Sequence, residues 1–366
     1  MSGTEAKDSV DWMRMQPVPC PVCGDEQSCL RICGRDDRCG MPGEFIIARC
    51  SFCQHLFMNP APIDDDLQKC YPDDYAPHQP VVPGTDAGSG VSSEAWREVA
   101  AVPWYLRYLP LRSIPGLRRL YGWLTDDWTQ PVPSAPAISG SLPRALEIGC
   151  STGRYLRKLE ESGWQVSGVE LCERPAELAV AAGLDVRCGT LEQAGFAAES
   201  FDLVAAWMVL EHVPRPLETL REVQRVLRPG GQVLLGVPNA GCWQRVVFGS
   251  NWYCLDLPRH LQHFRGNSLR RLAAASGLEV VSIRHHRLLA AVVGSAGIAV
   301  RRVCGESRLT RWLQLYPEQP RLWFQLLTAP AAILLSLLGQ GEGLTVCFRK
   351  PVTDAGTAAD GIQKSG

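Results

Sequence analysis

Two glycines and an acid in this chain have the types and spacing of a nucleotide-binding site. Gly149 and Gly153 frame the sequence Gly-Cys-Ser-Thr-Gly after an apolar run, and Glu170 follows 17 residues after Gly153. Glycines let the backbone turn sharply and approach a ligand, and a helix that starts there offers free N–H groups. An acid at this distance can accept hydrogen bonds from both ribose hydroxyls. The pattern fits a dinucleotide and S-adenosylmethionine equally well.

A second group of residues has the spacing of a metal site. Cys20 and Cys23 form one Cys-x-x-Cys pair, and Cys50 and Cys53 form another. Two such pairs separated by a strand-containing loop are typical of a tetrahedral structural zinc site. Buried free thiols are the alternative.

Other residues leave the exact ligand set open. Cys29, Cys33 and Cys39 lie between the two pairs and could compete as ligands or form a second site. His55 could replace Cys53, although we expect it to be an exposed histidine of the ribbon. Because so small a unit buries little core, metal binding would supply much of its folding energy.

Three histidines are candidates for a general base, since imidazole titrates near neutral pH. They are His212, His260 and His263. Each also has a purely structural alternative: His212 as a helix-start residue, the other two as hydrogen-bonding groups that cap the sheet. Arg259 could clamp an acidic acceptor or pair with Asp256.

Short strands and helices alternate after residue 144 and must position these groups. We expect strands at 145–149, 165–170, 184–188, 201–206, 232–237, 279–285 and 343–349. We expect helices near 153–162, 174–182, 215–228, 266–277 and in the 305–340 region. This alternation predicts an α/β fold with a doubly wound, mainly parallel sheet of seven strands. Ligands bind such a sheet beyond the carboxyl ends of its strands, where the glycine turn lies.

Composition limits the function classes. The 366 residues carry a net charge of −1 and 46% apolar residues, which is ordinary for a globular protein and gives no general attraction to nucleic acid. Residues 1–11 are polar, so we expect no secretory signal and a cytoplasmic protein. Eight of the 15 cysteines fall in the first 70 residues, and in that compartment metal ligands or buried thiols are favoured over disulfides.

The domain organisation follows from these patterns. We expect a zinc ribbon at 1–60, a connector and an aromatic-rich helical cap at 61–140, the main domain at 141–350 and a disordered tail at 351–366. Residues 322–341 contain no charged side chain, but Pro330 interrupts this apolar run. We therefore expect a buried or surface-docked helix rather than a membrane span, and peripheral membrane contact stays compatible with this segment.

Motifs downstream decide between the two nucleotide ligands. Phe-Asp-Leu-Val begins at Phe201, Leu-Glu-His-Val begins at Leu210, and Leu-Arg-Pro-Gly-Gly begins at Leu227. With the glycine turn and Glu170, this series resembles the class I S-adenosylmethionine-dependent methyltransferases over about 142–239. The cysteine-rich start and the segment 255–264 resemble a bacterial subgroup with an N-terminal zinc ribbon, which is linked to small molecules and cell-surface saccharides.

The resemblance implies a Rossmann-like methyltransferase sheet and a set of residues around the cofactor. They are Glu147, Gly149, Cys150, Ser151, Gly153, Glu170, Leu171, Thr190, Leu191, Trp207 and Met208. Thr190 stands where the family often has an acid, and Glu192 or backbone groups could replace it. Related ubiquinone-pathway enzymes can hold a divalent ion with an acid at the position of Met208, so we do not expect a catalytic metal.

Three functions remain open at this stage. The first is methyl transfer to a small-molecule acceptor, such as a secondary metabolite, a sugar or a lipid-linked intermediate. The second is an RNA methyltransferase that grips nucleic acid with its ribbon, which the charge balance disfavours. The third is a cofactor-binding module without turnover. Methyl transfer is an in-line displacement, so the protein mainly positions the acceptor and removes its proton.

Overall fold

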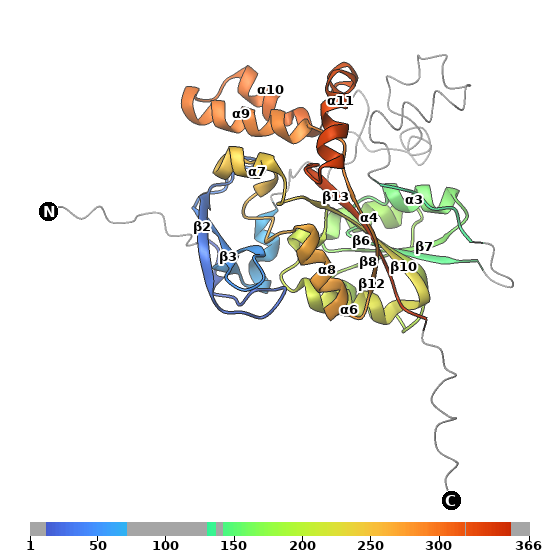
Figure 1. The fold of residues 1–366 in the computed structure, drawn as a ribbon. Coiled ribbons are helices and arrows are strands. Elements are labelled where there is room, and N and C mark those ends of the chain that lie inside the picture. Colours follow the sequence, from blue (N-terminus) through green and yellow to red (C-terminus); the bar gives the residue numbers. More distant parts are fainter. Residues whose placement is uncertain (1–11, 72–129, 137–141, 319, 353–366) are drawn as a thin grey trace, which may run out of the picture.

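The computed structural model describes residues 12–71, 130–136, 142–318 and 320–352 (Figure 1). Most of the expected connector and cap, and the tail beyond 352, lie outside the described residues. The glycine turn, the four paired cysteines and the three candidate histidines all lie within them.

The central sheet has seven strands in the order β12-β13-β10-β9-β6-β7-β8. Their bounds are β6 Arg144–Ile148, β7 Gln165–Glu170, β8 Val186–Cys188, β9 Phe201–Trp207, β10 Leu227–Pro238, β12 Glu279–His285 and β13 Gly343–Arg349. The pairs from β8 to β10 are parallel, and β13 runs antiparallel to both of its neighbours. The predicted mainly parallel sheet is confirmed, with all seven strands at the expected places.

Helices cover both faces of this sheet (Figure 1). Those of the doubly wound part are α3 Arg154–Glu161, α4 Glu173–Ala181, α5 Leu191–Ala194, α6 Pro216–Val226 and α8 Gly266–Ala275. Side chains alternate along β6, so Leu146 packs with α6 and α8 while Ala145 packs with α3. Because helices cover both faces, the central strand β9 is almost wholly buried, and ligands reach such a sheet at the strand ends.

The N-terminal ribbon is built into the rest of the molecule. Its strands are β1 Met15–Gln16, β2 Ser28–Gly34, β3 Phe45–Cys50, β4 Leu56–Met58 and β5 Ala61–Pro62, followed by η1 Asp64–Cys70. A two-residue strand from the main domain, β11 (Gln262–His263), pairs with β4 and completes a four-stranded sheet. Phe45 and Ile47 share a hydrophobic core with Trp252 and Leu257. The ribbon therefore packs on the loop that precedes β11.

Short helices fill the connection from β10 to β11. They are α7 Trp243–Phe248, η6 Gly249–Asn251 and η7 Tyr253–Leu255, and η5 Leu210–His212 follows β9. Three longer helices separate β12 from β13: α9 Ala290–Cys304, α10 Arg308–Leu315 and α11 Leu322–Leu337, with η8 Tyr316–Glu318 between the last two.

No sequence pattern predicted α9. A side chain at Gly297 would collide with the backbone of α10 at Leu313 and Gln314, so this glycine lets the two helices cross closely. Glycine in a helix interior lowers helix propensity, which hid the element. Within the described residues no single helix is long and apolar enough to cross a bilayer, whereas Arg308–Glu318 and Trp323–Leu337, bent by 64°, meet that length and composition test together.

Candidate functional site

The glycine turn leaves β6 with three residues in left-handed backbone conformations. Gly149 has φ 66°, Ser151 φ 47° and Gly153 φ 82°. A Cβ at Gly149 would collide with a methyl group of Val209, and one at Gly153 with a methyl group of Leu184. Both glycines are therefore required by backbone angle and by space, and Ser151 occupies the middle position as expected.

Glu170 closes this turn from the end of β7. Its two carboxylate oxygens accept hydrogen bonds from the N–H groups of Ser151 (2.8 Å) and Cys172 (2.9 Å). Each carboxylate oxygen can accept a second hydrogen bond, so the group can hold ribose hydroxyls while it fixes the turn. The carboxylate thus fits the role that the resemblance implies.

Glu147 places a second acid beneath the same turn. It is buried, and its Oε2 has no hydrogen-bond partner among the described residues. Burial, and then the nearby charge of Glu170, raise the pKa of Glu147 well above its ordinary value. An unpaired buried carboxyl oxygen is costly, and a cation bound at the turn would compensate for it. The α-ammonium of S-adenosylmethionine is such a cation.

The remaining predicted cofactor residues outside β9 follow the carboxyl ends of β6, β7 and β8. Thr190 caps α5, where its Oγ1 accepts a hydrogen bond from Gln193 N, so this side chain is already engaged. Leu191 is buried, Leu171 is half-buried, and Cys150 is buried. Glu192 accepts a hydrogen bond from Thr219. The N–H of Thr190 donates to Gln193 Oε1 and its carbonyl accepts from Ala194 N, so the hydroxyl proton is the group that Thr190 can still offer to an adenine.

Trp207 and Met208 at the end of β9 differ in environment. Trp207 packs edge-on against Tyr155 in the core, with ring centroids 5.3 Å apart. Met208 is exposed and has a φ of 55°, an uncommon backbone for a residue other than glycine. Strained backbones of this kind cluster at functional sites, so of the two residues Met208 is better placed to meet an acceptor.

A cluster of acid and histidine side chains follows directly. Glu211, His212 and His260 each have an atom that could bind a metal ion, and these atoms all lie within 4.8 Å of one another. The ring centroids of His212 and His260 are 4.7 Å apart. Glu211 is fully buried, and neither of its carboxyl oxygens has a hydrogen-bond partner in the described part of the chain. Burial raises the pKa of Glu211 to about 8, so it is largely protonated at neutral pH.

His212 has a defined orientation in this cluster. Its Nδ1 lies 3.1 Å from the carbonyl oxygen of Arg259 and 2.9 Å from the hydroxyl of Tyr71. A carbonyl can only accept, so the contact with Arg259 favours a proton on Nδ1 and a lone pair on Nε2, with the Tyr71 hydroxyl as a second acceptor at Nδ1; a Tyr71 hydroxyl that donates there would require the other tautomer. Burial, and then the charge of His260, lower the pKa of His212 to about 3, so the ring is neutral at pH 7.

The other two histidines are buried. His260 Nδ1 lies 2.9 Å from the carbonyl oxygen of Cys254, and its Nε2 lies 3.7 Å from Asp256 Oδ2. His263 is on β11, and its Nε2 has no partner among the described residues. Burial lowers the pKa of both rings. The structure thus brings His260 to His212 and puts His263 in the joint with the ribbon.

Arg259 is an ion-pairing residue in the interior. Its guanidinium has no exposure and donates hydrogen bonds to Asp36 (2.8 and 3.0 Å) and to Asp256 (2.7 and 2.9 Å). Of the two predicted alternatives, pairing with Asp256 is the one found. Asp36 and Tyr71 were not predicted, because both lie in stretches that carry no motif. Arg259 therefore ties the ribbon to the chain beside His212.

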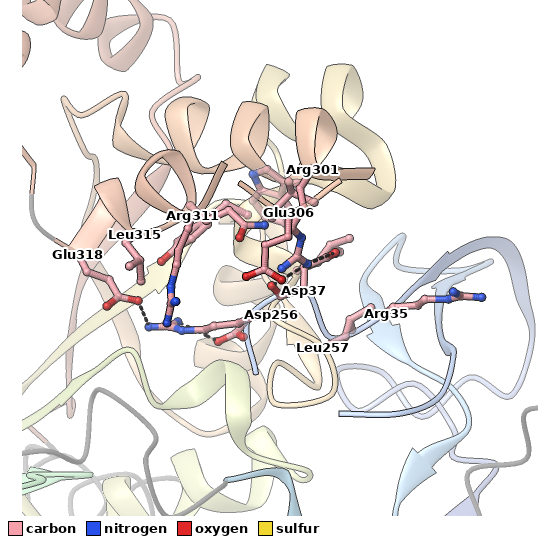
Figure 2. Close-up of a pocket in the computed structure, with 15 residues that line it drawn as sticks. Arg35, Asp37, Asp256, Leu257, Arg301, Glu306, Arg311, Leu315 and Glu318 are labelled. Atoms are coloured by element: carbon pink, nitrogen blue, oxygen red, sulfur yellow. Dashed lines mark hydrogen bonds and ion pairs between the residues drawn. The ribbon is translucent and has the colours of Figure 1, made fainter. Parts of the chain in front are cut away.

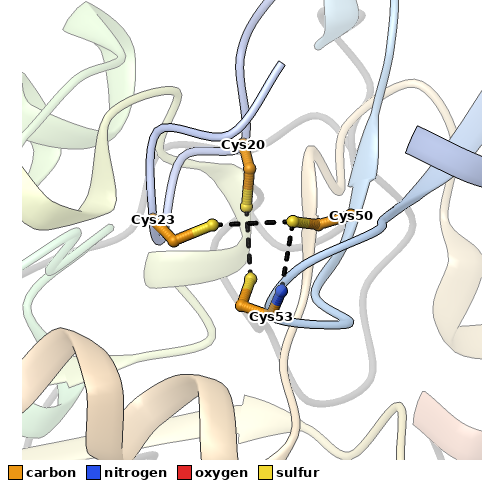
Figure 3. Close-up of side chains that lie close together, drawn as sticks. All are labelled: Cys20, Cys23, Cys50 and Cys53. Atoms are coloured by element: carbon orange, nitrogen blue, oxygen red, sulfur yellow. Dashed lines mark hydrogen bonds between the residues drawn. The ribbon is translucent and has the colours of Figure 1, made fainter. Parts of the chain in front are cut away.

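The four paired cysteines converge on one point (Figure 3). The Sγ atoms of Cys20 and Cys53, and those of Cys23 and Cys50, are each 3.5 Å apart. A disulfide would need about 2.05 Å. Sulfurs at the corners of a tetrahedron around zinc, with Zn–S of about 2.3 Å, lie about 3.8 Å apart. The arrangement of the four sulfurs fits a metal ion with tetrahedral coordination.

The residues that could have competed with the four cysteines as metal ligands do not belong to the cluster. Cys29, Cys33 and Cys39 are outside the cluster. The expectation that His55 is exposed was wrong: it is fully buried and contacts Gln262 Oε1 (3.0 Å) and Ser268 Oγ (3.2 Å). The pairing of β4 with β11 covers this histidine, and no local pattern could indicate that.

A cavity of about 260 Å³ lies between the ribbon, residues 252–257 and helices α9 and α10 (Figure 2). Arg38 lines this cavity and forms ion pairs with Asp256 (3.3 Å) and Glu318 (2.7 Å). Because Asp256 Oδ2 also faces His260, one carboxylate separates the cavity from the histidine cluster.

Comparison with known proteins identifies the family. A family model described as "Methyltransferase domain" matches residues 121–283. A curated protein of Pseudomonas aeruginosa, "Ubiquinone biosynthesis O-methyltransferase", is 31% identical over 202 residues, which cover 51% of this chain and 82% of that protein. The chain belongs to the class I S-adenosylmethionine-dependent methyltransferases.

Two further proteins are similar to this chain. The protein of the same name from Pseudomonas entomophila is 27% identical over 202 residues, covering 51% of this chain and 82% of its own length. A crystal structure of an S-adenosylmethionine-dependent methyltransferase from Mesorhizobium loti aligns with a TM-score of 0.41 and 17% identity over 63% of this chain and 97% of that one. The ribbon and helices α9 to α11 lie outside the family match.

Proposed function

We propose that this methyltransferase methylates a hydroxyl group of a small-molecule acceptor and that His212 accepts the proton. The names of the curated relatives support O-methylation, since both are O-methyltransferases of a small-molecule pathway. The observation that carries the proposal is the contact between His212 Nδ1 and the carbonyl of Arg259, which favours a lone pair on Nε2, next to the strained end of β9.

The cofactor would be held by the glycine turn. Glu170 would accept hydrogen bonds from the ribose, Glu147 would compensate the α-ammonium, and the backbone at Gly149 and Gly153 would lie against the ligand. When bound, S-adenosylmethionine supplies an electrophilic methyl group and a neutral thioether leaving group. The chain itself needs to orient the acceptor, exclude water and take up one proton.

His212 is suited to that last task. The carbonyl of Arg259 favours this tautomer, as a backbone carbonyl does for many catalytic histidines, so Nε2 receives the proton that the hydroxyl loses. We assign a positioning role to His260, because its ring packs against that of His212 and its Nδ1 faces the carbonyl of Cys254, and we assign no catalytic role to His263, which lies in the joint with the ribbon.

A small acceptor is favoured over nucleic acid by the charge of the ribbon. Residues 12–71 contain six Lys or Arg and eight Asp or Glu, which gives a net charge of −2. Phosphate backbones are bound by clustered cations, so this surface lacks the expected attraction. A secondary metabolite, a sugar or a lipid-linked intermediate remains the proposed acceptor class.

We further propose that Cys20, Cys23, Cys50 and Cys53 bind one Zn²⁺ with a structural role. Four thiolates leave no open position for chemistry, so the ion would stabilise the ribbon and its contact with Arg259. Metal analysis of the gently purified protein should find one zinc per chain. A protein that is folded and free of zinc would contradict this proposal.

Variants at two histidines test the proposed base. Radiolabelled S-adenosylmethionine is supplied with three separate acceptor sets: simple phenols, free and lipid-linked sugars, and total RNA. We expect label in a small-molecule fraction and none in RNA. His212→Asn should lower kcat about 10²–10⁴-fold, with cofactor affinity unchanged. His263→Asn, the matched control, should retain most of the activity. Full activity of His212→Asn, or labelled RNA alone, would overturn the proposal.

A further inference from the structure

Helix α11 exposes its large apolar side chains. Trp323, Leu327 and Leu337 are 62%, 71% and 80% exposed, and the other exposed apolar residues of the helix are Leu326, Leu334 and Leu338. At about 100° per residue these six positions fall within an arc of about 120° on the helix surface. They form one continuous apolar stripe rather than scattered exposures.

The opposite side of α11 is small and polar. Ala329 and Ala332 are the buried positions. Thr328 donates a hydrogen bond to the carbonyl of Phe324 (2.7 Å), and Ser336 donates one to the carbonyl of His285 (2.8 Å). A surface helix in water turns its apolar side towards the protein core, whereas α11 turns its large apolar side chains towards the solvent. Large exposed apolar patches mark interaction sites.

The neighbouring helix α10 extends this surface. Leu309 and Trp312, one turn apart, are exposed there. Helices α9, α10 and α11 lie together at the top of Figure 1, where α9 contacts the ribbon through the ion pairs of Arg301 and Arg302 with Asp37. Leu315 of α10 is exposed towards the cavity and is not counted here; we call the other exposed large apolar side chains of α10 and α11, with the capping residue Leu338, the apolar end face: Leu309, Trp312, Trp323, Leu326, Leu327, Leu334, Leu337 and Leu338.

Positive charge surrounds this face. Arg308, Arg311 and Arg321 are exposed, and none has an ion pair with any described residue. Between 288 and 341 the chain has five arginines and two glutamates, a net charge of +3 in a protein whose total is −1. Apolar stripes with flanking arginines and tryptophans are typical of helices that lie in the interface of a bilayer.

We infer that the apolar end face docks on a bilayer that carries anionic phospholipids. Helix α11 has 16 residues, about 24 Å in length, which is less than the hydrocarbon thickness of about 30 Å. It therefore lies in the interface instead of crossing it. A second copy of the chain is the competing occupant, but a symmetric contact would bring the unpaired arginines of both copies together.

Vesicle flotation with the full-length protein tests this inference. Wild type should float with vesicles of phosphatidylcholine and phosphatidylglycerol and should not float with phosphatidylcholine alone. Leu334→Glu/Leu337→Glu and Arg308→Glu/Arg311→Glu should each lower the bound fraction at least tenfold. The matched control is Val180→Glu/Val281→Glu, at valines that are each 52% exposed outside this face, and it should bind like wild type. Circular dichroism and thermal unfolding confirm that each variant is folded.

Three results would overturn the inference. One is the absence of flotation with anionic vesicles, and another is equal flotation with neutral ones. The third is a dimer in light scattering that Leu334→Glu/Leu337→Glu dissociates, with no vesicle binding, which would identify a second copy as the occupant. Vesicle binding requires neither cofactor nor acceptor, so its outcome is separate from that of the proposed methyl transfer.

Discussion

Replacing Arg259 by methionine should destabilise the protein by about 3–5 kcal/mol, the usual cost of breaking a buried ion pair. The guanidinium is unexposed and lies between the carboxylates of Asp36 and Asp256, whose side chains are 0% and 4% exposed. Methionine would fill much of the volume but leave the buried carboxylate of Asp36 without Arg259 and that of Asp256 with Arg38 alone. The cost thus arises from uncompensated charge rather than from a cavity.

A triple variant separates these two causes. Asp36→Asn/Asp256→Asn/Arg259→Met removes all three charges, and apolar or neutral replacement of a whole buried ion group is often close to neutral. We expect it to recover most of the stability that the single variant loses. Urea unfolding followed by tryptophan fluorescence, with zinc held constant, measures both. A loss below about 1 kcal/mol for Arg259→Met, or a triple variant as unstable as the single one, would refute the reasoning.

The pH dependence of this loss has a definite sign. Burial raises the pKa of Asp256, but the charges of Arg259, His260 and Arg38 and the hydrogen bond from Arg259 together outweigh it, and the net pKa lies well below the ordinary value. A carboxylate with a lowered pKa stabilises the fold above its unfolded pKa of about 4 and loses that contribution as pH falls. In the variant the largest of the lowering contributions is lost, so the pKa of Asp256 should rise and the group should take up a proton at a higher pH than in the wild type. The loss of unfolding free energy caused by Arg259→Met should therefore be largest near pH 7–8 and smaller at pH 5.

Two further predictions concern the sites themselves. Gly149→Ala adds a Cβ against Val209 at a φ of 66°, so S-adenosylhomocysteine affinity in calorimetry should fall at least tenfold; unchanged affinity would mean that the turn does not carry the ligand. Cys23→Ser removes one of four converging sulfurs, so bound zinc should fall below half of wild type and the ribbon should become sensitive to protease. Full zinc retention in that variant would point to a different ligand set.

The sequence located what depends on local pattern. All seven strands of the central sheet were found, because buried strands are apolar and alternate with amphipathic helices. The glycine turn was found because Gly149 and Gly153 meet a backbone requirement that few other residues satisfy. The cysteine cluster followed from spacing alone, since each pair fixes two sulfurs on one turn.

Contacts between distant segments could not be predicted in this way. Arg259 meets Asp36 across 223 residues, and nothing near either residue signals the other. Strand β11 has only two residues, so it has no periodicity, yet it buries His55 and joins the ribbon to the main domain. The apolar run at 322–341 predicted an amphipathic helix, but only the structure shows that its leucines face outwards.

Calorimetric titration with S-adenosylhomocysteine tests the central claim most directly, namely that the glycine turn and Glu170 form the cofactor site. The account predicts one site per chain in the wild type. For Glu170→Ala it predicts a loss of about 1–3 kcal/mol in binding free energy, the cost of removing a charged hydrogen-bonding partner, while the control Glu177→Ala on the exposed side of α4 binds normally. No binding by wild type, or full affinity in Glu170→Ala, would contradict it.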